Sequence, residues 1–134
     1  MSTFHFELVS PERQLFEGPV ESVVVPASEG DMTILPNHAP VMTTLRAGIV
    51  AVSEGKGGSA LRLFVRGGFA DVNATGLTIL AEVALPVDEI RADQVAVQMQ
   101  AAEAQLRDAK SDDAKAYAEE KLDGLKEMMA LVRN

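Results

Sequence analysis

The composition of the chain changes sharply near residue 87, and this division limits the folds open to it. Nine of the ten glycines and all six prolines lie in residues 1–87, whereas ten alanines and no proline lie in residues 88–134. Glycine and proline mark turns, and alanine is the residue that most favours a helix. We therefore expect a turn-rich domain at residues 1–87 and a helical domain at residues 88–134.

The N-terminal part has the pattern of many short strands. Phe4, Phe6 and Leu8 alternate with polar His5, a period of two that places the apolar side chains on one face. Turns are expected at Gly18-Pro19, at Gly48, in a hairpin loop EGKGG (54–58) and at Asn73-Ala74-Thr75-Gly76. Short strands with turns every ~8–12 residues, without βαβ alternation, predict a β-sandwich or barrel.

The C-terminal part has the pattern of two amphipathic helices. Apolar residues recur at steps of four and three in two series: Val95, Met99, Ala102, Leu106 and Ala109, then Ala118, Leu122, Leu125, Met129 and Val132. Each series is a seam that requires an apolar partner. Ser111-Asp112-Asp113, where Ser or Asp can cap a helix, is a short connection that makes the helices antiparallel neighbours. The fold class is thus β plus α, a β-sandwich followed by an antiparallel two-helix hairpin.

Charge and composition exclude several functions. The formal charge is −8, and it divides evenly: residues 1–87 hold five basic and nine acidic side chains, and residues 88–134 hold seven and eleven. Neither part is a basic arm for nucleic acid or anionic lipid. The absence of cysteine removes thiolate nucleophiles and cysteine zinc sites. No apolar run approaches the ~18 residues of a membrane span, so we expect no direct membrane insertion.

Catalytic and metal-binding patterns are scarce. No HxxxH or G-x-S-x-G sequence is present, and His5 is interpreted as a solvated strand residue. The string EGKGGS lacks the spacing of a phosphate-binding loop and is interpreted as a flexible hairpin tip. We expect neither an enzyme nor a metal site.

One segment, Ser28 to Val41, is unusually constrained. Gly30 permits positive φ, and Pro36 and Pro40 each fix φ near −65° and restrict the preceding residue. Two interpretations stay open. The loop presents residues to a partner, or it is a stiff corner in which His38 bonds to the backbone.

The stretch SEGDMTILPNHAPVMTTLRAG closely resembles the signature of the epsilon subunit of bacterial and chloroplast F-type ATP synthases. FELVSPERQLFEGPVESVVVP and FVRGGFADV resemble strands of that family, and the alanine-rich helices match its C-terminal region. Thr33 and Asn37 depart from the signature, because the family usually has glycine at both positions. Asn tolerates left-handed φ, so we expect the loop to be preserved.

The resemblance implies a non-catalytic subunit of the central stalk that requires no cofactor. Its expected partners are the gamma subunit and the polar loops of the membrane c-ring, which would place it on the cytoplasmic face of the bacterial inner membrane. The resemblance places Asp31 toward the c-ring loops and His38 near the gamma subunit. The full set of expected interface residues is Gly30, Asp31, Met32, Ile34, Pro36, His38 and Pro40.

The resemblance also implies ATP as a regulatory ligand at the start of the first helix. Some members bind ATP through I/L-D-x-x-R-A, and this chain has Val87-Asp88-Glu89-Ile90-Arg91-Ala92. The expected nucleotide-binding residues are Asp88, Arg91, Ala92, Lys121 and Lys126. In the simpler interpretation Asp88 caps the helix, and Arg91 is solvated or pairs with Asp88. A rival function follows, that of a free-standing nucleotide-sensing module.

In that family the hairpin also inhibits ATP hydrolysis by inserting between gamma and the alpha/beta catalytic head. Residues 108–134 hold five basic and seven acidic side chains. This balance is unfavourable for docking on an acidic surface. We therefore expect weak inhibition.

Overall fold

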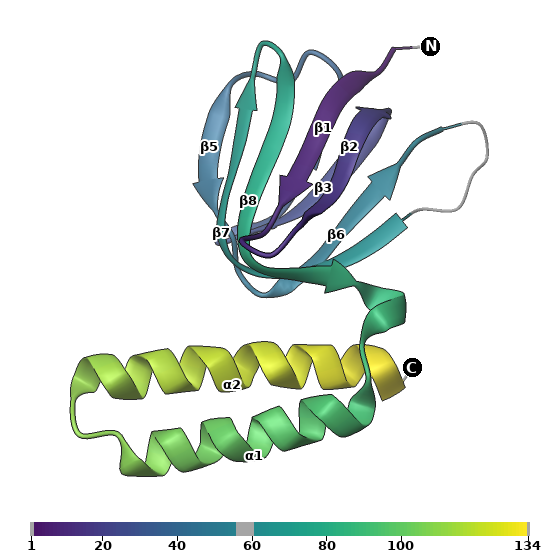
Figure 1. Cartoon of the computed structure of the whole chain (residues 1–134). Helices are drawn as coiled ribbons and strands as arrows, with labels where there is room; N and C mark the ends of the chain where they lie inside the picture. The colour runs from purple at the N-terminus through teal and green to yellow at the C-terminus, as the bar shows by residue number, and fades with distance from the viewer. Residues whose placement is uncertain (1, 56–60, 134) are drawn as a thin grey trace. The chain divides into compact units, whose positions relative to one another are not determined.

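A computed structural model describes residues 2–55 and 61–133, and the chain divides into two compact units between Pro86 and Val87. Within the described residues the first unit contains eight strands, and the second contains a short 3-10 turn and two α-helices (Figure 1). This arrangement confirms the predicted fold class.

The strands of the first unit form one continuous, strongly bent sheet. Their bounds are β1 Phe4–Val9, β2 Gln14–Val20, β3 Ser22–Ala27, β4 Gly30–Ile34, β5 Val41–Thr44, β6 Gly48–Ser53, β7 Leu61–Asn73 and β8 Gly76–Pro86. The order is β2-β1-β8-β7-β6-β3-β4, and β5 pairs with β7. β1 and β8 are parallel, whereas the other pairs are antiparallel.

Two glycines in the middle of β7 allow this sheet to fold into a sandwich. Gly67 and Gly68 have φ of 72° and 96°, a region that side chains with a Cβ rarely adopt. Before this point β7 pairs with β6, and after it β7 pairs with β5. β7 therefore belongs to one layer in its first half and to the other in its second half. A Cβ on Gly68 would lie 1.9 Å from the carbonyl oxygen of Leu80, so the two strands approach as closely as their backbones allow.

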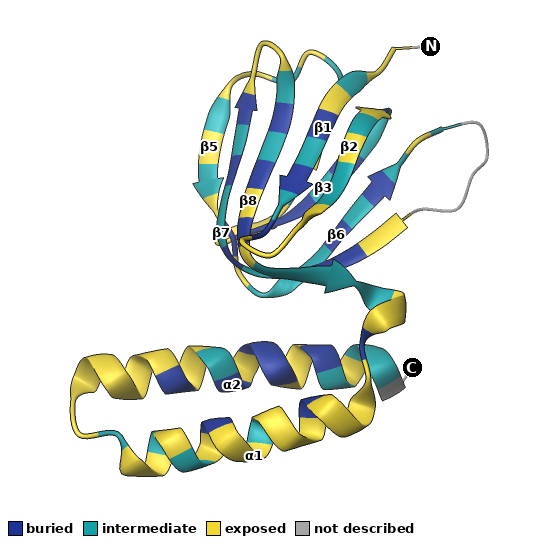
Figure 2. Cartoon of the chain, in the orientation of Figure 1, coloured by how far each residue is buried: buried dark blue, intermediate teal, exposed yellow. Residues whose placement is uncertain are grey.

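The core of the first unit lies between the inner faces of the two layers. Along β1 the predicted alternation is confirmed, because Phe6 and Leu8 are fully buried and His5 is exposed. Buried residues alternate with more exposed ones on β6 and along the first part of β8 as well, whereas β3 and β7 each contain three consecutive buried residues (Figure 2). The cluster also contains valines and leucines from β2, β3, β6, β7 and β8.

Some predicted turns are confirmed and others are wrong. The turn after Asn73 is confirmed, and the Asn73 side chain accepts a hydrogen bond from the Thr75 backbone N–H at 2.9 Å. The predicted break at Gly18-Pro19 is wrong, since both residues lie inside β2. β2 is an edge strand, where a proline without an N–H costs no ladder hydrogen bond. The predicted hairpin loop at 54–58 falls mostly outside the described residues.

The second unit is a hairpin of α1 Ala92–Asp108 and α2 Asp112–Arg133. Ser111 caps α2 as predicted, because its Oγ accepts a hydrogen bond from the Ala114 N–H at 3.1 Å. The seam is largely confirmed: Val95, Ala102, Ala118, Leu122 and Leu125 are buried, and Met99, Leu106, Met129 and Val132 are half-buried. Among the helices described, none combines the length and apolarity needed to cross a bilayer.

Candidate functional site

The constrained loop after β4 is a tight turn held by its own backbone. The N–H of His38 donates to the Leu35 carbonyl at 3.1 Å, with Pro36 and Asn37 at the two central positions. Asn37 has a φ of 69°, so it adopts the left-handed conformation that glycine would adopt there. Nδ1 of His38 lies 2.7 Å from the Ala39 carbonyl, which confirms that this imidazole bonds to the backbone.

The expected interface residues from Gly30 to Ile34 form strand β4 and not a loop, because they pair with β3. Gly30 has a φ of 138°, as expected for a turn that needs glycine. Along β4 the side chains alternate, so Asp31 is exposed, Met32 is half-buried and Ile34 is 1% exposed. The Ile34 side chain therefore serves the core and is not available to a partner.

The strand places Asp31 and His38 in different surroundings. Asp31 lies near the start of β4, where its Oδ1 accepts a hydrogen bond from Arg46 Nη2 at 2.7 Å. His38 follows the end of β4 and lines a cavity of 640 Å³ at one end of the sandwich. The same cavity is lined by His5, whose Nε2 lies 3.5 Å from Glu17 Oε2. The cavity therefore brings together two imidazoles that are 33 positions apart in the sequence.

The predicted nucleotide motif spans the junction between the 3-10 turn and α1. Asp88 is exposed within the 3-10 turn Val87–Glu89, and Ala92 is the first residue of α1. Arg91 is the N-cap residue, without a side-chain capping bond, and its Nε lies 3.8 Å from Asp93 Oδ1. In the simpler interpretation the cap is wrong, because Arg91 and not Asp88 is the N-cap residue of α1, whereas the Arg91 side chain is largely solvated, as that interpretation allowed.

The two lysines expected to complete the nucleotide site lie on α2. Lys126 lines a shallow groove between the helices with Met99, Glu103 and Met129. Neither Asp88 nor Arg91 lines this groove, and Lys121 is half-buried outside it. The structure thus does not gather the five predicted residues into one pocket. Within residues 2–55 and 61–132, no group of His, Asp or Glu side chains is arranged to hold a metal ion.

The fold and the loop match a known family. Residues 3–87 match the family described as the beta-sandwich domain of the ATP synthase delta/epsilon chain. The chain belongs to this family. It is 52% identical over 124 residues to the ATP synthase epsilon chain of Parvibaculum lavamentivorans, covering 92% of this chain and 93% of that one. It is 48% identical over 122 residues to the epsilon chain of Mesorhizobium japonicum, with coverage of 91% and 90%.

Solved structures of ATP synthases contain chains of the same fold as this epsilon-family member. One lies in the OSCP/F1/c-ring structure of the Euglena gracilis mitochondrial enzyme, with a TM-score of 0.78, 25% identity and coverage of 98% of this chain and 82% of that one. Another lies in the central stalk/c-ring structure of the Tetrahymena thermophila mitochondrial enzyme, with a TM-score of 0.71, 18% identity and coverage of 96% of both. Both matches extend over the strands and the helices.

A surface of this epsilon-family member that the sequence did not predict lies on the outer face of β1, β8, β7 and β5. Val9 is opposite Leu80, and Leu80 is opposite Phe69, so the three form a row across the strands. Met42 lies diagonally from Phe69, and it is 65% exposed, while Leu80 is 42% exposed. The sequence does show that the segment LTILAEV breaks strict alternation at Leu80, but only the strand order brings these four apolar side chains together.

Proposed function

We propose that this chain is a non-catalytic subunit of the central stalk, and that it couples rotation of the c-ring to the catalytic head. The observation that carries this proposal is the match over both units, with 52% identity to an epsilon chain across 92% of the sequence. The likeness to a chain of an F1/c-ring assembly over 98% of the chain supports the same assignment.

The sandwich offers a surface suited to the gamma subunit. The row formed by Val9, Leu80 and Phe69, extended by Met42, is apolar and partly exposed on the outer face of the sheet. Apolar patches of this kind on a soluble domain mark protein contacts. The His38 turn, fixed by Pro36 and by backbone hydrogen bonds, supports a further contact that must transmit torque without deforming.

Asp31 suits a contact with the polar loops of the c-ring. It is exposed at the start of β4, where a carboxylate can meet basic loop side chains. This contact would hold the chain at the cytoplasmic face of the bacterial inner membrane as a peripheral component. The acidic sandwich would then reach the membrane rotor through local contacts and not through attraction to anionic lipid.

Co-purification tests this function. An affinity-tagged chain expressed in its own host should be recovered with a membrane-bound ATPase that contains gamma and the c-ring. Substituting both Leu80 and Met42 by Asp should lower recovery at least tenfold, whereas Val97→Asp, on the exposed face of α1, should not. Recovery of the tagged chain alone, without ATPase, would exclude the stalk function and favour a free-standing nucleotide sensor.

We also propose ATP as a regulatory ligand of the hairpin, with Asp88, Arg91, Ala92, Lys121 and Lys126 as its residues. The match to the D-x-x-R-A pattern supports this idea, as does the exposure of Asp88 and Arg91 to solvent. Calorimetry with millimolar ATP should give a heat that Arg91→Gln removes and that Arg107→Gln, an exposed position in the last turn of α1, leaves unchanged. If the unaltered chain gives no heat with ATP, ATP is excluded as its ligand.

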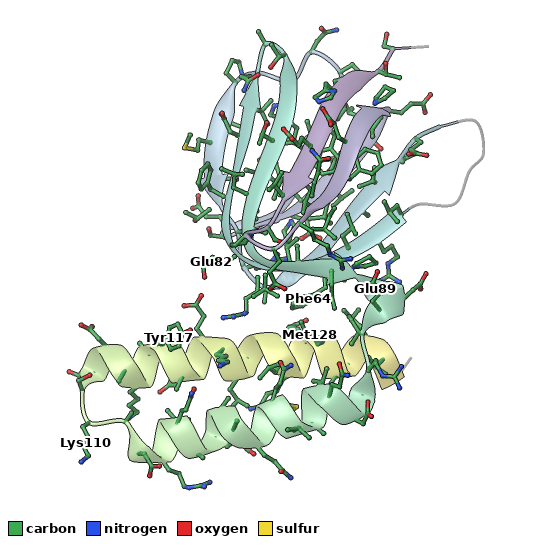
Figure 3. All side chains as sticks on the ribbon, viewed as in Figure 1. Phe64, Glu82, Glu89, Lys110, Tyr117 and Met128 are labelled. Atoms are coloured by element: carbon green, nitrogen blue, oxygen red, sulfur yellow. The ribbon has the colours of Figure 1, made fainter. Side chains whose placement is uncertain are left out.

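Inhibition of ATP hydrolysis by the hairpin should be weak. Acidic side chains outnumber basic ones on residues 108–134, and Lys110 extends from the connection between α1 and α2 (Figure 3). Lys115 and Lys126 fall on one side of α2, but Glu119 and Asp123 lie beside them on the intervening turns, so acidic side chains flank these cations. Like charges would oppose docking of this hairpin on an acidic catalytic head.

A further inference from the structure

Arg46 is held on a rigid part of the sandwich. It follows Leu45, which is buried and whose N–H donates to the Gly68 carbonyl at 3.0 Å. The N–H of Arg46 itself donates to the Pro26 carbonyl at 3.0 Å. The backbone of Arg46 is therefore fixed on both sides, between β3 and the bend of β7.

The turn that precedes Asp31 is fixed to the same segment. Ser28 donates to the Thr44 carbonyl through its N–H at 2.9 Å and through its Oγ at 2.8 Å. Asp31 pairs with Pro26 in the β3–β4 ladder. Both ends of the Asp31–Arg46 contact thus start from backbone that is held by hydrogen bonds, and only the two side chains must be ordered when the ion pair forms.

The ion pair uses one oxygen of the carboxylate. Nη2 of Arg46 lies 2.7 Å from Oδ1, and the two side chains are 45% and 63% exposed. Within residues 2–55 and 61–132, the Asp31 side chain makes no other polar contact. Oδ2 is therefore accessible to an external cation, but that cation would also approach the guanidinium.

The charge of Arg46 opposes the charge of Asp31 at this surface. A cation that binds Oδ2 is attracted by the carboxylate and repelled by a guanidinium a few ångströms farther away. The attraction and the repulsion largely cancel, because the ion pair as a whole has a net charge of nearly zero.

We infer that Arg46 weakens the electrostatic attraction between Asp31 and a basic partner, because its guanidinium already pairs with the carboxylate that the partner would approach. This inference rests on the proposed function, because the basic partner is the polar loop of the c-ring. A weak, short-range contact of this kind adds little to affinity.

Binding of the full chain to ATPase membranes from which this subunit has been removed tests the inference. At low ionic strength Arg46→Gln should bind about threefold to fivefold more tightly than the unaltered chain, since an exposed ion pair changes binding by up to about fivefold. At 1 M salt, where the screening length is about 3 Å, the gain should vanish. Arg46→Lys retains the cation and should bind within about twofold of the unaltered chain at both ionic strengths.

The double variant Asp31→Asn/Arg46→Gln separates charge from folding. It should lose the gain of Arg46→Gln, because the carboxylate that the substitution exposed is gone. Equal or weaker binding by Arg46→Gln, or a gain that persists in the double variant or at 1 M salt, would overturn the inference while the proposed function stands. Failure of the unaltered chain to bind the membranes would overturn the proposed function and this inference with it.

Discussion

The sandwich and the hairpin carry the same net charge but differ in how they are built. The sandwich buries large side chains completely, among them Phe6, Leu8 and Ile79. The two most deeply buried seam residues of the hairpin are Ala102 and Ala118, which contribute little apolar area. A core of large, completely buried side chains holds the loops of the sandwich in fixed positions. The hairpin, with a seam of small side chains, is stabilised by few groups. This difference agrees with the torque transmission proposed for the sandwich and with the regulatory role proposed for the hairpin.

The largest expected effect is on the bend of β7. Gly68→Ala places a Cβ against the backbone of β8 and requires positive φ, so it should destabilise the sandwich by at least about 4 kcal/mol. Gly30→Ala is the matched control, because Gly30 also has positive φ but no atom lies within 4 Å of its added Cβ. It should cost only about 1–2 kcal/mol. Urea unfolding monitored by far-UV circular dichroism measures the stability of both variants. Equal losses of stability would contradict the claim that the bend depends on the close approach of β7 and β8.

An intermediate effect is expected in the hairpin. Leu122→Ala removes one of its few large buried side chains and should destabilise it by about 2–3 kcal/mol. Tyr117 lies on α2 and is the only tyrosine of the chain, which has no tryptophan, so its fluorescence reports on this unit alone. Val97→Ala, at a 67% exposed position, should change the transition by less than about 0.5 kcal/mol. A shift of the β-sheet transition as large as that of Tyr117 would show one cooperative unit and remove the distinction.

The smallest effect concerns the start of α2. Ser111→Ala removes the capping hydrogen bond to the Ala114 N–H and should lower hairpin stability by about 1 kcal/mol. Ser111→Asp retains an acceptor and should restore most of the loss. Tyr117 fluorescence in urea provides the comparison, and an unchanged midpoint for Ser111→Ala would mean that the cap contributes nothing in this context.

Local sequence patterns predicted most strands and helices. The features that the sequence did not predict depend on pairing between segments that are distant in the chain. Alternation in FHFELV, the Asn73 turn and the helical seams depend on neighbours in sequence, and Asn37 takes the left-handed φ that its position suggested. The strand order is not encoded locally. Gly18-Pro19 therefore resembled a break until β2 was placed at an edge, and Arg46 could not be matched to Asp31, 15 residues away. The 3-10 turn at Asp88 was missed because its sequence also suits a helix start.

Truncation after residue 87 tests most directly whether the sandwich alone supports coupling and the hairpin only modulates hydrolysis. In membranes whose ATPase contains the truncated chain in place of the full one, proton-driven ATP synthesis should be at least about half of the normal rate, because the proposed stalk contacts all lie on the sandwich. ATP hydrolysis should rise by less than about twofold, since the proposed inhibition by the acidic hairpin is weak. Loss of ATP synthesis, with the truncated chain still recovered in the complex, would contradict the account, as would a large activation of hydrolysis.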